Sequence, residues 1–191
     1  MNPEDFILMF KKTGALLEGH FILTSGLHSA TYFQCSKILQ HPEYRELFSK
    51  IIAEHFRSKN VELVISPAMG GIVIGSAVGR ELGVRSIFTE RENGQMTLRR
   101  GFSISQGENV LVVEDVVTTG GSVKEVIEIV RKAGGNLTGV GVIVNRSGGK
   151  IHLTDDQYSV VQLDLVTYPE DQVPVELKQI PAIKPGSRSL K

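Results

Sequence analysis

Val110–Ser122 reads VLVVEDVVTTGGS, and this stretch decides the fold because it joins an apolar strand, a polar turn and the start of a helix. Val110–Val113 is an uninterrupted apolar run, which is typical of a strand buried on both faces of a sheet. The polar residues that follow lead into an amphipathic helix predicted over Ser122–Ala133. Parallel sheets are built from such strand–helix units, so the stretch predicts an α/β fold.

The same unit recurs on both sides of this stretch. Apolar strands, a helix over Gly71–Leu82 and a hairpin turn at Asn93-Gly94 indicate a central, mainly parallel sheet flanked by helices on both faces. The further strands are predicted at VELVIS (61–66), RSIFTE (85–90), TGVGVIVNR (138–146) and VVQLDLV (160–166).

The N-terminal part follows a different pattern. Asn2-Pro3 predicts the start of a helix that runs to about Leu17, with Leu17 facing inward. Two short aromatic and β-branched runs, HFILTSG (20–26) and TYFQCS (31–36), predict a small strand pair. On the helix predicted after this pair, His55 is interpreted as a packing residue and not as a catalytic base.

Composition excludes several classes of protein. Lys+Arg and Asp+Glu both number 21, so no net charge attracts nucleic acid or an anionic membrane. The single cysteine, Cys35, cannot form a disulfide within the chain and is interpreted as a small, semi-buried side chain. The N-terminus lacks the pattern of a signal peptide, and the longest uncharged stretch, from Leu63, is interrupted by Pro67 and by glycines. We therefore expect a cytoplasmic protein with no membrane or nucleic-acid partner.

The acidic pair Glu114-Asp115 ends the buried strand, which is the edge where ligands bind in open α/β sheets. The turn Thr118–Ser122 offers hydroxyl groups, free backbone N–H groups and the positive end of a helix dipole, which together suit a phosphate dianion. A ribose 5-phosphate matches this layout, with its phosphate in the turn and its hydroxyls on the carboxylates. The alternative is a helix-capping turn, with Ser122 as the cap, beside two solvated acids.

VLVVEDVVTTGGS closely resembles the phosphoribosyl-diphosphate (PRPP) motif of type I phosphoribosyltransferases. FILTSGLHSATYF (21–33), SPAMGGIVIG (66–75) and Asn145-Arg146 resemble elements of the orotate phosphoribosyltransferase family in particular. The resemblance implies the type I phosphoribosyltransferase fold with a small N-terminal hood. We expect one domain over residues 1–191, in which 1–36 form the hood and the proline-rich 168–191 form an extended tail.

The activity that this resemblance implies is the conversion of orotate and PRPP into orotidine 5′-monophosphate and pyrophosphate, a step of pyrimidine biosynthesis. The family resemblance also implies Mg²⁺ carried by PRPP, no metal ion bound directly by the protein, and a homodimer with shared active sites. Two alternatives stay open: a phosphoribosyltransferase for another base, and a PRPP-sensing regulatory protein without turnover.

The resemblance also assigns roles to residues of this chain. Glu114 and Asp115 would hold the ribose hydroxyls, and Arg146 would bind the orotate carboxylate through its guanidinium fork. Thr118 would also contact the base. Tyr32 and Phe33 would line the site of the base or, alternatively, belong to the core. The remaining substrate-binding residues would be Val116, Val117, Thr119, Gly120, Gly121 and Ser122 around the ribose 5-phosphate, and Ala68, Met69, Gly70 and Gly71 at pyrophosphate.

The chain departs from the family pattern where pyrophosphate charge must be neutralised. Thr24 stands where many members have lysine, Met69-Gly70 replaces an aromatic-lysine pair, and the flexible loop is shortened to RENGQMTLRR (91–100). The remaining cationic candidates are Arg91, Arg99 and Arg100. Our hypothesis is that Arg99 or Arg100 acts at pyrophosphate, reaching it across the dimer interface; the alternative is a solvated, charged hairpin.

Overall fold

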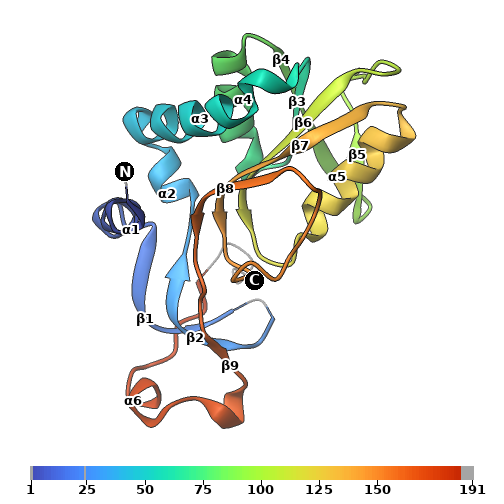
Figure 1. Ribbon diagram of the computed structural model, residues 1–191. Coiled ribbons are helices and arrows are strands. Elements are labelled where there is room, and N and C mark those ends of the chain that lie inside the picture. Colours follow the sequence, from blue (N-terminus) through green and yellow to red (C-terminus); the bar gives the residue numbers. More distant parts are fainter. Residues whose placement is uncertain (1, 24, 186–191) are drawn as a thin grey trace. The chain divides into compact units, whose positions relative to one another are not determined.

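The computed structural model describes residues 2–23 and 25–185 (Figure 1). The chain divides into two compact units. The smaller unit combines the residues up to Ile38 with those from Asp164 onward, and the larger unit is Leu39–Leu163. The expectation of one domain with a hood stays a prediction. No helix within the described ranges is both long enough and apolar enough to span a membrane.

The larger unit is built on a six-stranded sheet in the order β5-β4-β3-β6-β7-β8. All neighbouring pairs are parallel except β4 and β5, which form the antiparallel hairpin predicted at Asn93-Gly94. This confirms the mainly parallel sheet. The strands are β3 (Leu63–Pro67), β4 (Arg85–Glu92), β5 (Gln95–Leu98), β6 (Asn109–Val117), β7 (Asn136–Asn145) and β8 (Gln157–Gln162).

Helices cover both faces of this sheet, and Figure 1 shows α4 and α5 on opposite sides. Alternate strand residues such as Leu63 and Val112 join the core beneath α5. On the other face, glycines of β7 make room for α3, since a Cβ atom at Gly141 would lie 2.6 Å from Ile52 Cγ2. The glycines within the apolar run TGVGV are therefore required by helix packing. The helices of this unit are α3 (Pro42–Phe56), η1 (Arg57–Lys59), α4 (Gly70–Leu82) and α5 (Gly121–Lys132), and α2 (Ser36–Leu39) lies where the chain passes from the smaller unit to the larger one.

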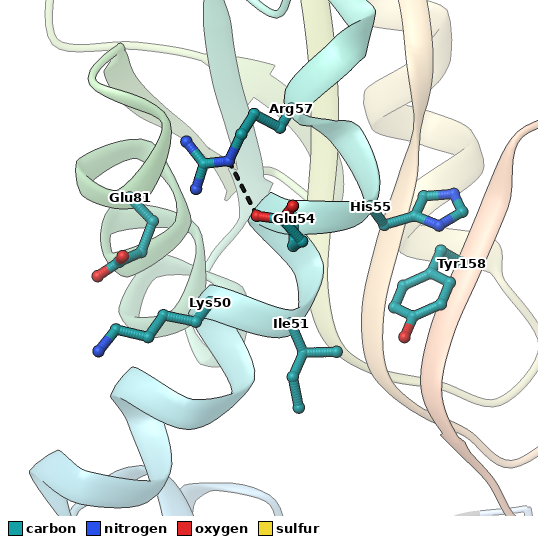
Figure 2. A pocket seen from close by; sticks show the side chains of 7 residues that line it. All are labelled: Lys50, Ile51, Glu54, His55, Arg57, Glu81 and Tyr158. Atoms are coloured by element: carbon teal, nitrogen blue, oxygen red, sulfur yellow. Dashed lines mark hydrogen bonds and ion pairs between the residues drawn. The ribbon is translucent and has the colours of Figure 1, made fainter. Parts of the chain in front are cut away.

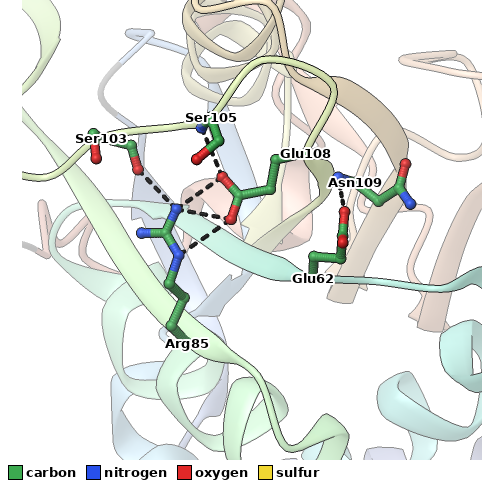
Figure 3. A network of polar contacts seen from close by, with 6 residues as sticks. All are labelled: Glu62, Arg85, Ser103, Ser105, Glu108 and Asn109. Carbon is green, nitrogen blue, oxygen red and sulfur yellow. Dashed lines mark hydrogen bonds and ion pairs between the residues drawn. The ribbon is translucent and has the colours of Figure 1, made fainter.

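The starts of three strands are joined by a polar network at the edge of the sheet opposite the acidic pair (Figure 3). Arg85 of β4 binds both carboxylate oxygens of Glu108, with Nη2–O distances of 2.8 Å. Glu108 also accepts a hydrogen bond of 2.8 Å from the backbone N–H of Ser105. Glu62, just before β3, accepts one of 2.8 Å from the backbone N–H of Asn109 in β6. Glu108 and Glu62 thus join β3, β4 and β6 where they begin.

The smaller unit contains an antiparallel sheet in the order β1-β2-β9, which confirms the predicted strand pair. Its first helix begins at a capping box between Asn2 and Asp5 but ends at Lys12, so the prediction that it runs to Leu17 is wrong. Gly14 stops the helix with a φ of 69°, and Leu17 lies in β1 with 41% of its surface exposed. The elements are α1 (Pro3–Lys12), β1 (Leu16–Ile22), β2 (His28–Phe33), β9 (Thr167–Tyr168), η2 (Glu170–Gln172) and α6 (Val175–Lys178).

The C-terminal tail is not extended throughout, which corrects the expectation from its prolines. Pro169 and Pro174 each precede a short helix, η2 and α6, as its N-cap. Their φ angles of −58° and −56° suit the entry into a helix as well as an extended chain. Residues 186–191 lie outside the described part of the chain.

Candidate active site

The acidic pair lies at the carboxyl end of β6 and is turned into the protein. Glu114 is only 8% exposed, which contradicts the alternative of two solvated acids. Each carboxylate accepts a hydrogen bond from the next backbone N–H: Asp115 N–H donates to Glu114 Oε1 at 3.0 Å, and Val116 N–H donates to Asp115 Oδ1 at 2.9 Å. These hydrogen bonds hold both carboxylates at the end of the strand.

The loop after β3 packs directly against this pair. A Cβ atom at Gly70 would lie 2.5 Å from Asp115 Oδ2, and one at Gly71 would lie 2.8 Å from Glu114 Oε1. Only glycine therefore allows the loop to approach the two carboxylates so closely. Ala68 N–H donates 2.8 Å to the carbonyl oxygen of Thr89 in β4, which fixes the start of the loop. The structure thus brings together the acidic pair and the loop that resembles the family's pyrophosphate loop.

A small cavity of about 70 Å³ adjoins the acidic pair at the start of α5. Gly120 occupies the N-cap of α5 with a φ of 75°, so Ser122 lies in the first helical turn and is not the cap that the alternative required. The first N–H groups of a helix have no partner within it, which makes this end suitable for an anion. The cavity is lined by Glu114, Val116, Val117, Thr118, Thr119, Gly120, Gly121, Ser122 and Val123.

Val123 is the lining residue that the sequence reasoning missed. The sequence could have indicated Val123, because a residue in the first turn of a helix that follows a phosphate-binding turn lies next to the bound phosphate. Its side chain is 1% exposed and belongs to the core under α5, which is why a valine stands there.

Burial changes the protonation of the acidic pair. It raises the pKa of Glu114 well above its usual value, and the neighbouring Asp115 charge raises it further. Burial also raises the pKa of Asp115. Two adjacent buried carboxyl groups cannot both ionise without repulsion, unless hydroxyl donors or a cation approach them. Raised pKa values of this kind are frequent at functional sites, which makes the pair a candidate for ligand binding.

Arg146 lies beside this edge, directly after β7. Its backbone N–H donates 2.8 Å to the carbonyl oxygen of Val117, the last residue of β6. Just before it, Asn145 is buried, and its Oδ1 accepts hydrogen bonds from the Ser147 backbone N–H at 2.9 Å and the Ser147 hydroxyl at 2.7 Å. The structure thus anchors the backbone of Arg146 next to the strand that carries the acidic pair.

The three arginines of the hairpin region form ion pairs with acidic side chains. Arg91 Nη2 lies 2.6 Å from Glu125 Oε1 in α5, and Arg99 Nη2 lies 3.3 Å from Glu92 Oε1. Arg100 Nε lies 2.7 Å from Glu90 Oε2. Their contact with pyrophosphate stays a prediction.

The residues predicted to line the site of the base belong to the smaller unit. Phe33 is 4% exposed and packs edge-on against Phe10, with ring centroids 4.8 Å apart, so it is part of the core of that unit. Tyr32 is partly buried, and its ring lies 5.6 Å from that of Phe21. Thr24, where the family pattern has lysine, lies outside the described residues.

A wider groove of about 690 Å³ follows the exposed side of α3, away from the acidic pair (Figure 2). Within it, His55 stacks on Tyr158 with ring centroids 4.2 Å apart and hydrogen-bonds to Asp156 at 3.0 Å, which agrees with its interpretation as a packing residue. Among its lining residues, Arg57 Nε and Glu54 Oε2 form an ion pair of 2.9 Å. The groove is lined by Lys50, Ile51, Glu54, His55, Arg57, Glu81 and Tyr158.

Comparison with known proteins shows the family to which the chain belongs. The model of the phosphoribosyl transferase domain matches residues 34–179. A protein of Chlorobium phaeobacteroides (strain DSM 266) named orotate phosphoribosyltransferase is 56% identical over 189 residues, covering 99% of this chain and 98% of that protein.

Solved structures share the fold. Orotate phosphoribosyltransferase from Aeropyrum pernix superposes with a TM-score of 0.69 at 25% identity, over 82% of this chain and 92% of that one. Adenine phosphoribosyltransferase from Thermoanaerobacter pseudethanolicus superposes with a TM-score of 0.62 at 15% identity, over 70% and 88%, and so shares the fold alone. On the family match and on full-length relatives above half identity, this chain belongs to the type I phosphoribosyltransferase family, among the orotate phosphoribosyltransferases.

Proposed function

We propose that this protein transfers the 5-phosphoribosyl group of PRPP to orotate and releases pyrophosphate, as in pyrimidine biosynthesis. The observation that carries the proposal is the close approach of Gly70 and Gly71, at the start of α4, to Asp115 and Glu114, beside a cavity at the start of α5. One edge of the sheet thereby presents two carboxylates between two places suited to phosphate groups. PRPP has the same order of groups: 5-phosphate, ribose hydroxyls and diphosphate.

The reaction needs no nucleophile from the protein. The bond between C1′ and the diphosphate oxygen breaks ahead of attack, with its electron pair leaving on the diphosphate. A ring nitrogen of orotate then captures the oxocarbenium-like ribosyl centre and loses its proton to the departing diphosphate or to water. Glu114 and Asp115 would accept hydrogen bonds from the ribose hydroxyls, and their negative charge would stabilise the developing cation. The Thr118–Ser122 turn would hold the 5-phosphate, so that the ring is fixed while C1′ moves from one partner to the other.

Magnesium enters this proposal with the substrate. Within residues 2–23 and 25–185, no cluster of three or more His, Cys, Asp or Glu side chains could hold an ion alone. Mg²⁺ commonly keeps several waters and is bound together with substrate phosphates, so the ion would be carried by the diphosphate of PRPP and not held directly by protein side chains. When bound, the ion would neutralise charge on the departing diphosphate.

Orotate recognition is proposed for Arg146, whose planar guanidinium can form two parallel hydrogen bonds with a carboxylate. The support is its place: its backbone is anchored to Val117, and the cavity-lining Thr118 follows directly in the chain. Thr118 is exposed and would contact the same base. Tyr32 and Phe33 enter the proposal from the family resemblance alone.

The diphosphate side lacks the lysines that many relatives use. Backbone N–H groups of Ala68–Gly71 would bind this group, and we infer that Arg99 or Arg100 adds the missing positive charge from the partner subunit of a homodimer. Side-chain exposures of 48% for Arg99 and 61% for Arg100 leave both within reach of a second chain. We also infer that the enzyme acts in the cytoplasm, without membrane or nucleic-acid partners.

A spectrophotometric assay with PRPP, Mg²⁺ and a panel of bases tests the proposal. We expect orotate to be consumed and pyrophosphate to be released in equal amounts. Consumption of adenine or uracil, and not of orotate, would show that the enzyme transfers the phosphoribosyl group to a different base. PRPP binding by calorimetry with no turnover of any base would instead identify a regulatory protein.

A further inference from the structure

The segment between β7 and β8 packs on the phosphate turn. A Cβ atom at Gly120 would lie 2.8 Å from Leu153 Cδ2 and 3.0 Å from Ile151 Cγ2. Both side chains are partly buried and join the core beneath α5. Gly120 is the N-cap of α5, so these two side chains press against the point where the turn becomes the helix.

Hydrogen bonds fix the shape of this segment from both ends. Near its start, the Ile151 N–H donates 3.2 Å to the Ser147 hydroxyl oxygen, and that hydroxyl donates 2.7 Å to the buried Asn145 Oδ1. Near its end, Gln157 accepts a bond of 2.9 Å from the Leu153 N–H and donates one of 3.3 Å to the Ile151 carbonyl oxygen. Ile151 and Leu153 are therefore held in place by the ends of β7 and β8.

Arg146 lies at the start of the same segment. Its own N–H is bonded to Val117, one residue before the exposed part of the phosphate turn. The segment thus contacts the phosphate-binding residues twice, once through the backbone of Arg146 and once through Leu153 and Ile151 at Gly120. We expect a displacement of the turn to move the segment as well, because the side chains of Leu153 and Ile151 lie against Gly120.

We propose that Ile151 and Leu153 are positioning residues that join the phosphate turn to Arg146, so that the two loops act as one unit in substrate binding. The inference rests on the proposed function, and it concerns side chains that line no part of the cavity. The 5-phosphate of PRPP holds the turn, the turn holds Leu153, and the segment then presents Arg146 to the orotate carboxylate. The reverse order holds equally, because coupling between two binding sites is reciprocal.

The test compares the KM values of Leu153→Ala with those of a matched control, Leu137→Ala. Both leucines are partly buried against the same core, but Leu137 lies at the opposite end of β7. We expect Leu153→Ala to raise the KM of both PRPP and orotate about tenfold. Leu137→Ala should lower thermal stability to a similar extent and leave both KM values near those of the wild type. A variant that only loses folded protein would lower apparent kcat and leave KM unchanged.

A second variant tests the inference if Leu153→Ala does not fold. Gln157→Ala removes both hydrogen bonds to the segment and leaves its apolar side chains in place, and it should raise the same two KM values. The inference is overturned if a folded Leu153→Ala or Gln157→Ala raises one KM alone or neither, or if Leu137→Ala raises both. Absence of orotate turnover in the wild type would instead reject the proposed function, so the two failures are distinguishable.

Discussion

Gly70 faces the carboxylate of Asp115 so closely that a Cβ atom on it would lie 2.5 Å from Oδ2 and 2.7 Å from Oδ1. Gly70 is the first residue of α4, and Asp115 ends the apolar run of β6. The contact therefore joins two parallel strand–helix units at the edge of the sheet where they meet. It shows that the backbone at Gly70 approaches Asp115 without room for a side chain.

Gly70→Ala should accordingly damage the site and spare the fold. Alanine suits the first turn of a helix, and the φ angle of Gly70 is not positive, so the free energy of unfolding should change little. The added methyl group must displace Asp115 or the loop by about 1 Å, which we expect to lower kcat/KM about 100-fold. Ser76→Ala, on an exposed position of the same helix, is the control. Full activity in Gly70→Ala would show that the contact has no catalytic meaning.

Glu114→Gln should stabilise the empty protein at neutral and higher pH. The pKa of Glu114 is raised by burial and by Asp115, so the folded protein binds that proton more tightly than the unfolded chain does. Its contribution to stability is therefore fully present below the ordinary pKa of 4.5 and is lost as pH rises through the raised value.

Urea denaturation between pH 5 and pH 8 measures this effect. The wild type should lose stability across the range, whereas Glu114→Gln should lose less and have the higher midpoint at pH 8. We expect its activity to fall about 100-fold, since the charge near the ribosyl centre is gone. Glu43→Gln, at an exposed position of α3, should behave as the wild type. A stability that depends more steeply on pH in Glu114→Gln than in the wild type would contradict the raised pKa of Glu114.

Glu108→Ala should have the opposite profile, with stability lost and activity kept. The Glu108 carboxylate is 11% exposed and binds Arg85 and the Ser105 N–H at the edge of the sheet away from the acidic pair. Loss of these charge-assisted bonds should cost about 1–3 kcal/mol in the free energy of unfolding. Steady-state kinetics of the folded variant should match the wild type. A matched control is Glu128→Ala, because that carboxylate forms an exposed ion pair with Arg131.

Much of this fold follows from local pattern. The buried strand residues Val110–Val113 and the helix after them are indicated by the pattern of apolar residues. Asn93-Gly94 strongly favours a two-residue hairpin turn, which the structure has between β4 and β5. The prediction of α1 failed because the apolar pattern was followed to Leu17, although Gly14, a typical residue just past a helix end, interrupts it. The short helices after Pro169 and Pro174 were missed because proline fits both an extended chain and a helix start.

The site was predictable as a set of segments but not as a set of contacts. The acidic pair and the turn are adjacent in sequence, so their chemistry could be read together. The approach of Gly70 to Asp115 and of Leu153 to Gly120 joins residues more than 30 positions apart. Such contacts depend on strand order and on packing between units, which no local pattern specifies.

Arg146→Lys should raise the KM of orotate much more than the KM of PRPP. Lysine keeps the charge but cannot offer the planar fork that matches a carboxylate, so the KM of orotate should rise about 10- to 100-fold. The KM of PRPP should change much less, because the backbone N–H of residue 146 still binds Val117. Arg131→Lys, on the exposed end of α5, is the control. An unchanged orotate KM would move the base-recognition role away from Arg146.

Arg99→Ala and Arg100→Ala test the source of positive charge at pyrophosphate. In the structure each arginine pairs with a glutamate of the hairpin, Glu92 or Glu90, so a role at pyrophosphate requires that pair to open. The variant of the acting arginine should raise the KM of PRPP and lower kcat, together about 100-fold in kcat/KM. The other should behave as the wild type, and two fully active variants would reject the hypothesis.

Mixing two inactive variants then decides between the arginine's own subunit and its partner. Glu114→Gln damages the site of its own subunit, whereas an arginine acting across the interface serves the other subunit's site. A mixed dimer of Glu114→Gln with the inactive arginine variant would then contain one site with an intact acidic pair and an intact arginine from its neighbour. That site should restore up to half of wild-type activity per mixed dimer after the subunits exchange. An arginine acting within its own subunit leaves one site without the carboxylate and the other without the arginine, so the mixture would stay inactive.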